Sequence, residues 1–69
     1  MNMHITLEQE VDGRWIAEVS DLPGVLVYGT TPDEAASAAQ ALALRVLADR
    51  IEHGEELPPA VAALFAVPA

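Results

Sequence analysis

The chain has 69 residues, of which 52% are apolar, and its eleven acidic residues against three arginines give a formal net charge of −8. A chain this short can form one small domain, whose core usually needs a supplement such as a disulfide, a metal or oligomerisation. Because the sequence contains no cysteine, disulfides and thiolate metal sites are excluded, and oligomerisation is the supplement we expect. The lack of a basic cluster argues against direct binding of nucleic acid and indicates a basic partner.

Hydropathy and the N-terminal sequence bear on the compartment. The N-terminus shows no basic region followed by an apolar run, so we expect no signal peptide. No apolar run approaches the roughly 20 residues that a membrane span requires. The high apolar content also argues against an acidic disordered tail. We therefore expect a folded, soluble protein of the cytoplasm that makes no contact with a membrane.

Residues 3–19 predict a β-hairpin. Apolar and polar side chains alternate over residues 3–11, and a second strand over residues 14–19 follows the turn signal Asp12-Gly13. A two-residue loop would place acidic side chains opposite core residues, whereas a three-residue loop with Gly13 in the left-handed conformation keeps one face apolar. We predict the second register, which pairs Leu7 with Ala17, Ile5 with Val19 and Gln9 with Trp15.

A sharp turn and a third strand follow the hairpin. Pro23 fixes φ and Gly24 supplies the positive φ of a type II turn within Ser20 to Gly24. The strand then runs from Val25 to Gly29. We expect it to fold back beside the hairpin.

A long helix is predicted from Pro32 to about His53. Thr31 and Glu34 have the spacing of a capping box, and Gly54 can adopt the left-handed conformation that ends the helix. The apolar residues cover an arc of roughly 200°, which is wider than one sheet face needs. They are Ala35, Ala36, Ala39, Leu42, Ala43, Leu44, Val46, Leu47 and Ile51. We therefore expect the edge at Leu44 and Ile51 to meet either the C-terminal tail or another subunit.

The sequence predicts an α+β fold of order β-β-β-α over residues 1–58, with a three-stranded antiparallel sheet and one long helix. Residues 59–69 form a tail that reads either as a short helical turn from Pro59 or as an edge strand through Leu64 to Val67. Of these two we favour the edge strand, which would be a short fourth strand.

The acidic side chains of the first hairpin raise the question of metal-dependent hydrolysis. Carboxylates that hold magnesium must converge in a concave site, but the predicted register projects Glu8, Glu10 and Glu18 from the face opposite the core. We expect a solvated acidic face, no metal or other cofactor, and no enzymatic activity. His53 is expected to interact with the negative end of the helix.

Two aromatic residues have different predicted roles. Trp15 is expected to lie in the core against the helix, whereas Tyr28 alternates with Val25 and Val27 and can point outward. An outward Tyr28 could act as an apolar interface anchor. Together with the acidic residues it completes the predicted partner-binding set, which is Glu8, Glu10, Glu18, Asp21 and Tyr28.

One series of residues is specific in its order and spacing: Trp15, Ala17-Glu18-Val19, Asp21-Leu22-Pro23-Gly24, Gly29, Thr31, Glu34-Ala35, an alanine-rich helix, Gly54 and Pro58. This series resembles the HicB antitoxin-like domain of bacterial toxin-antitoxin systems. The resemblance covers residues 3–58. It implies a partial RNase H-like fold without a nuclease centre.

The resemblance also implies a function. HicB-like domains bind a small basic ribonuclease toxin, HicA, and block its RNA-binding surface, so this chain is expected to be antitoxin-like. Carboxylates that compete with RNA phosphate for a basic toxin surface suit this role. Many members continue into an operator-binding domain, but residues 59–69 carry no basic side chain, so we expect no operator binding by this chain alone.

A second hypothesis is a stand-alone oligomeric module, regulatory or structural, without a toxin partner. In either case we expect a dimer or a higher even oligomer, formed through a strand edge or through the surplus apolar face of the helix.

Overall fold

The N-terminal hairpin forms in the register that the sequence predicts. In the computed structural model, which describes residues 3–68, strands β1 (Ile5–Gln9) and β2 (Trp15–Val19) are antiparallel. Ile5 lies opposite Val19, Leu7 opposite Ala17 and Gln9 opposite Trp15. The connecting loop has three residues and ends at Gly13, whose φ of 92° matches the predicted left-handed bulge.

A tight turn leads from β2 into the third strand, β3 (Leu26–Gly29), which pairs antiparallel with β2. Gly24 has a φ of 91°, and the N–H of Val25 donates to the carbonyl of Leu22 at 3.1 Å. These features confirm the predicted type II turn. The strand order is β1-β2-β3, so β1 and β3 are the two edges of the sheet.

Helix α1 (Pro32–Glu52) begins and ends at the predicted signals. The Oγ1 of Thr31 accepts from the N–H of Glu34 at 3.1 Å, while the Glu34 carboxylate accepts from the Thr30 hydroxyl at 2.7 Å. At the other end, Gly54 has a φ of 70°, and its N–H and that of Glu55 donate to the carbonyls of Ile51 and Arg50. This pair of bonds is the Schellman motif.

The tail forms a short helix, α2 (Pro59–Ala62), rather than the edge strand that we favoured. Its first turn is closed by bonds from the N–H groups of Val61 and Ala62 to the Pro58 carbonyl. Pro59 stands at the first helical position, where its missing N–H breaks no hydrogen bond, and this local signal favours the helix over the predicted strand. Residues 64–67 form no strand, so the sheet has three strands in the part of the chain described.

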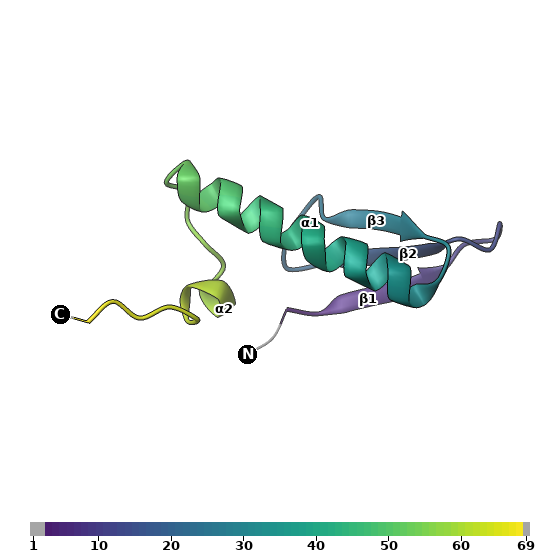
Figure 1. Cartoon of the computed structure of the whole chain (residues 1–69), viewed down its shortest axis with the longest axis horizontal. Helices are drawn as coiled ribbons and strands as arrows, with labels where there is room; N and C mark the ends of the chain where they lie inside the picture. The colour runs from purple at the N-terminus through teal and green to yellow at the C-terminus, as the bar shows by residue number, and fades with distance from the viewer. Residues whose placement is uncertain (1–2, 69) are drawn as a thin grey trace.

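The core lies between the sheet and α1 (Figure 1). Four of its nine buried residues are alanines, and Val61 of α2 adds to its far end. The buried residues are Ala17, Val19, Leu22, Val25, Ala35, Ala39, Ala43, Leu47 and Val61. Trp15 is half-buried against this cluster, as predicted.

The predicted segments 1–58 and 59–69 include residues 1, 2 and 69, which lie outside the described residues. Of the helices described, none combines the length and apolar character needed to cross a membrane.

Candidate protein-binding surface

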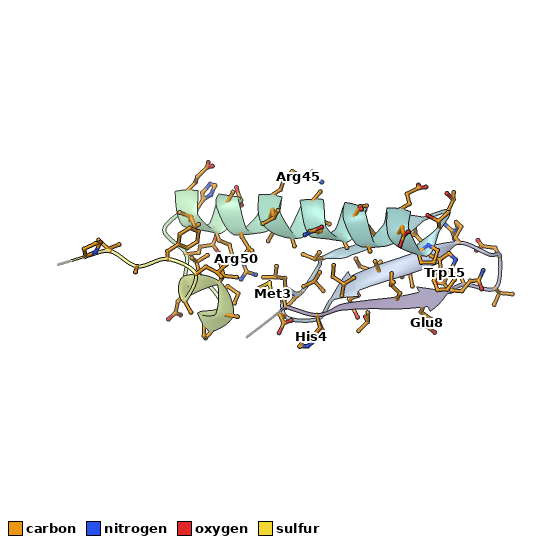
Figure 2. The ribbon with its side chains drawn as sticks, turned by 60° about the horizontal axis from the view of Figure 1, so that its bottom comes forward. Met3, His4, Glu8, Trp15, Arg45 and Arg50 are labelled. Atoms are coloured by element: carbon orange, nitrogen blue, oxygen red, sulfur yellow. The ribbon has the colours of Figure 1, made fainter. Side chains whose placement is uncertain are left out.

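The sheet has one face that α1 does not cover. We call this surface the outer sheet face, and strand alternation assigns to it Thr6, Glu8, Glu10, Arg14, Ile16, Glu18, Leu26 and Tyr28. Figure 2 shows Glu8 pointing away from α1, while Trp15 lies on the side of the sheet that faces the helix. No element within residues 3–68 packs on the outer sheet face.

The centre of the outer sheet face is apolar. Ile16 lies opposite Tyr28 on β3, and Glu18 lies opposite Leu26. Leu26 is 43% exposed and Tyr28 is 46% exposed, while Ile16 between the two edges is half-buried. Exposed leucine and tyrosine side chains on an uncovered sheet face are suited to anchoring a protein partner.

Acidic side chains border this apolar centre. Glu8 lies opposite Ile16 on the β1 side, and Glu18 lies in the next row opposite Thr6. Both side chains are exposed. Glu8, Glu18 and Tyr28 are therefore brought onto one surface, as the alternation predicted.

Glu10 lies across the hairpin from Arg14 and is half-buried. The N–H of Glu10 donates to the Arg14 carbonyl at 2.7 Å. The pKa of Arg14 is raised chiefly by its side-chain hydrogen bond to Asp12, and Glu10 adds a weaker attraction. The outer sheet face is thus mixed in charge at the loop end rather than uniformly acidic.

Asp21 lies apart from the strand residues, in the turn after β2. Its Oδ2 accepts from the backbone N–H of His4 at 3.2 Å, which ties this turn to the start of β1. Asp21 is therefore placed at the corner of the sheet, where it has a structural contact as well as a charge.

Arg14 is the main residue of this surface that sequence reasoning missed. Its guanidinium lies 4.4 Å from the centroid of the Tyr28 ring, a cation–π geometry. Its Nε also pairs with Asp12 Oδ2 at 2.7 Å. Hydrogen bonds from the Arg14 backbone and then from its side chain lower the pKa of Asp12. Alternation alone places Arg14 on this face, but its contact with Tyr28 depends on the register between β2 and β3.

No group of three or more histidine, aspartate and glutamate side chains within residues 3–68 is placed to hold a metal ion. His53 lies at the end of α1, with its Nδ1 2.8 Å from the Asp49 carbonyl oxygen and 3.3 Å from Asp49 Oδ1. This position matches the predicted interaction with the helix end.

A second exposed surface is apolar and lies beside the C-terminal half of α1, at the end of the core that Leu47 and Val61 form. A groove of about 660 Å³ separates the C-terminal half of α1 from α2 and the residues after it. It is lined by Met3, Leu44, Leu47, Ala48, Ile51, Ala60, Val61, Leu64 and Phe65. Leu44 and Ile51 face the tail across this groove but are not covered by it, since they remain 63% and 54% exposed.

Comparison with known proteins identifies no matching family model, no significantly similar curated protein and no significantly similar solved structure. The resemblance to HicB-like domains therefore depends on the residue series given above.

Proposed function

We propose that this chain is an antitoxin-like inhibitor that binds a small basic RNA-cleaving protein of the HicA type through the outer sheet face. The observation that carries the proposal is an uncovered sheet surface with an apolar centre and an acidic border, on a chain of net charge −8. As part of the same proposal, the protein acts in the cytoplasm and performs no catalysis itself.

The apolar and the acidic side chains of the outer sheet face have different roles in the proposed binding. Tyr28 and Leu26 offer apolar area that a partner can cover, and this area supplies affinity. Glu8 and Glu18 are solvated charges at its border, so they attract a basic partner and orient it. A partner held there would have its phosphate-binding side chains neutralised by carboxylates, which prevents RNA from binding.

The test begins with the tagged chain as bait at moderate salt, followed by purification of any small basic protein that it retains. That protein is assayed for RNA cleavage with and without the chain. We expect the wild-type chain to stop cleavage and the double variant Glu8→Lys/Glu18→Lys to lose inhibition. Tyr28→Ala is expected to weaken inhibition without changing the fold.

The matched control is the double variant Glu52→Lys/Glu56→Lys, which makes the same change in net charge at exposed positions away from the sheet. It should inhibit as well as the wild type. Equal inhibition by both double variants would contradict the proposed surface, and failure to retain any RNA-cleaving protein would contradict the antitoxin function.

A stand-alone oligomeric module is a second candidate, and the apolar groove favours it. Exposed Leu64 and Phe65, at 73% and 69%, give this chain a surface for assembly that needs no toxin. A gene for a small basic protein directly beside this one would favour the inhibitor, whereas an isolated gene would favour the module.

A further inference from the structure

We propose that two copies of this chain associate through an antiparallel pairing of their α1 helices, along a row formed by Ala41, Leu44, Ala48 and Ile51. The outer sheet face takes no part in this contact. The inference therefore does not depend on the toxin-binding function, and each can fail without the other.

Helix α1 carries two apolar stripes, and the row is the second, because the first is buried against the sheet. The core stripe consists of Ala35, Ala39, Ala43 and Leu47, all of them buried. The four residues of the row are all exposed, and their spacing of three, four and three residues is that of a coiled-coil seam. Figure 2 shows Arg45, a neighbour of the row, pointing away from the sheet.

The order of residues in the row makes it complementary to itself. Small and large side chains alternate, so that Ala41 and Ala48 offer holes while Leu44 and Ile51 offer knobs. In an antiparallel pair with its two-fold axis near Val46, Leu44 of one copy faces Ala48 of the other. Ala41 then faces Ile51 by the same symmetry. An isologous contact of this kind closes as a dimer.

The groove beside the row adds area to the contact. Leu64 and Phe65 form its far wall, and a helix seated on the row would lie against them. The four large side chains, Leu44, Ile51, Leu64 and Phe65, are between 54% and 73% exposed. Complete burial of a fully exposed side chain of this kind removes about 60–120 Å² of apolar surface. Because the four are only 54–73% exposed, together they would remove roughly 150–300 Å² per copy.

A standard interface takes about 800 Å² from each partner, of which these side chains would be the apolar centre. The rest must come from the alanines, the backbone and the polar rim along α1, whose 21 residues extend about 30 Å. The occupant we infer is a second copy rather than a charged protein, because every side chain that lines the groove is apolar.

The first experiment measures the mass of the chain in solution by light scattering after size exclusion, at micromolar concentration. We expect a dimer, and a shift to the mass of one chain for Leu44→Glu. The matched control is Leu26→Glu, which makes the same substitution at an exposed leucine of the outer sheet face and should remain a dimer. A monomeric wild type, or a dimer that only Leu26→Glu dissociates, would overturn the proposal.

The second experiment tests the register without disturbing the fold, since the sequence contains no cysteine. Leu44→Cys and Ala48→Cys are prepared separately, mixed and oxidised. We expect the mixed disulfide between the two variants to form several-fold faster than either self-pair. Preferential self-pairing of Leu44→Cys would indicate parallel helices and would refute the antiparallel contact.

The response to salt concentration distinguishes this dimer contact from toxin binding. Each copy carries a net charge of −8, so screening by salt should favour the dimer. Binding of a basic protein to the outer sheet face should weaken over the same range of salt. A dimer that dissociates as salt rises would contradict an apolar helix contact.

Discussion

The close contact between Gly29 and α1 gives a prediction whose magnitude can be worked out from the structure. Gly29 is buried at the end of β3, and a Cβ atom added there would lie 2.6 Å from the Ala35 nitrogen and 2.8 Å from its Cα. Both are backbone atoms of α1, so no side-chain rotation relieves the overlap. Overpacking of this kind costs about 1–3 kcal/mol, and we expect Gly29→Ala to fall in the upper part of that range.

For a domain of this size, such a loss lowers Tm by about 10–20 °C. Circular dichroism during heating and urea titration measures it, with all variants at one protein concentration because association adds to stability. The double variant Gly29→Ala/Ala35→Gly should not recover the loss, since the closest atoms are the nitrogen and Cα that glycine retains.

Gly54→Ala is the control, because its Cβ would meet nothing within 4 Å and only its φ of 70° is strained. It should cost about 1 kcal/mol. A fall of less than about 0.5 kcal/mol for Gly29→Ala would refute the close approach of β3 to α1.

Three further changes test other parts of the structure. Thr31→Ala removes the acceptor for the Glu34 N–H and should lower the free energy of unfolding by about 1 kcal/mol in urea titration. Arg14→Ala should raise the pKa of Asp12, which an NMR titration measures, because the Arg14 side chain no longer donates to the carboxylate. Folding lowers the pKa of Asp12, so its carboxylate stabilises the fold at neutral pH. This stabilisation is lost as the pH falls through the pKa of Asp12 in the folded protein. Val61→Ser should free α2 from the core and speed proteolysis after residue 57 without abolishing the thermal transition.

The hairpin, the turns and α1 could be predicted because local chemistry specifies each of them. Gly13, Gly24 and Gly54 take the positive φ angles that their turns require, and Thr31 caps the helix. Pairing Leu7 with Ala17 followed from the need to keep one sheet face apolar. These signals act over a few residues, so one sequence is enough to read them.

The tail and the details of the candidate surface depended on contacts that a single sequence does not display. Residues 59–67 are apolar without a clear period, so the start signal at Pro59 does not by itself distinguish a helix from a strand, and the packing of Val61 against the core accompanies the helix. Arg14 lies over Tyr28 because β2 pairs with β3 in one register, which places residues 14 positions apart in contact. The sequence shows the charge of the acidic residues, but it does not show that Arg14 pairs with Asp12 and partly neutralises the loop end of the outer sheet face.

The composition of the core explains why association through α1 is expected on energetic grounds. Alanines at the helix–sheet contact permit the close approach at Gly29, but each buries little apolar surface. Several of the largest apolar side chains, among them Leu44, Leu64 and Phe65, consequently remain outside the core. A chain this small gains little net free energy from its own core, so the unused apolar surface is where further stabilisation is available. The same alanine-rich helix that limits the monomer's core supplies the alternating row that can pair with a second copy.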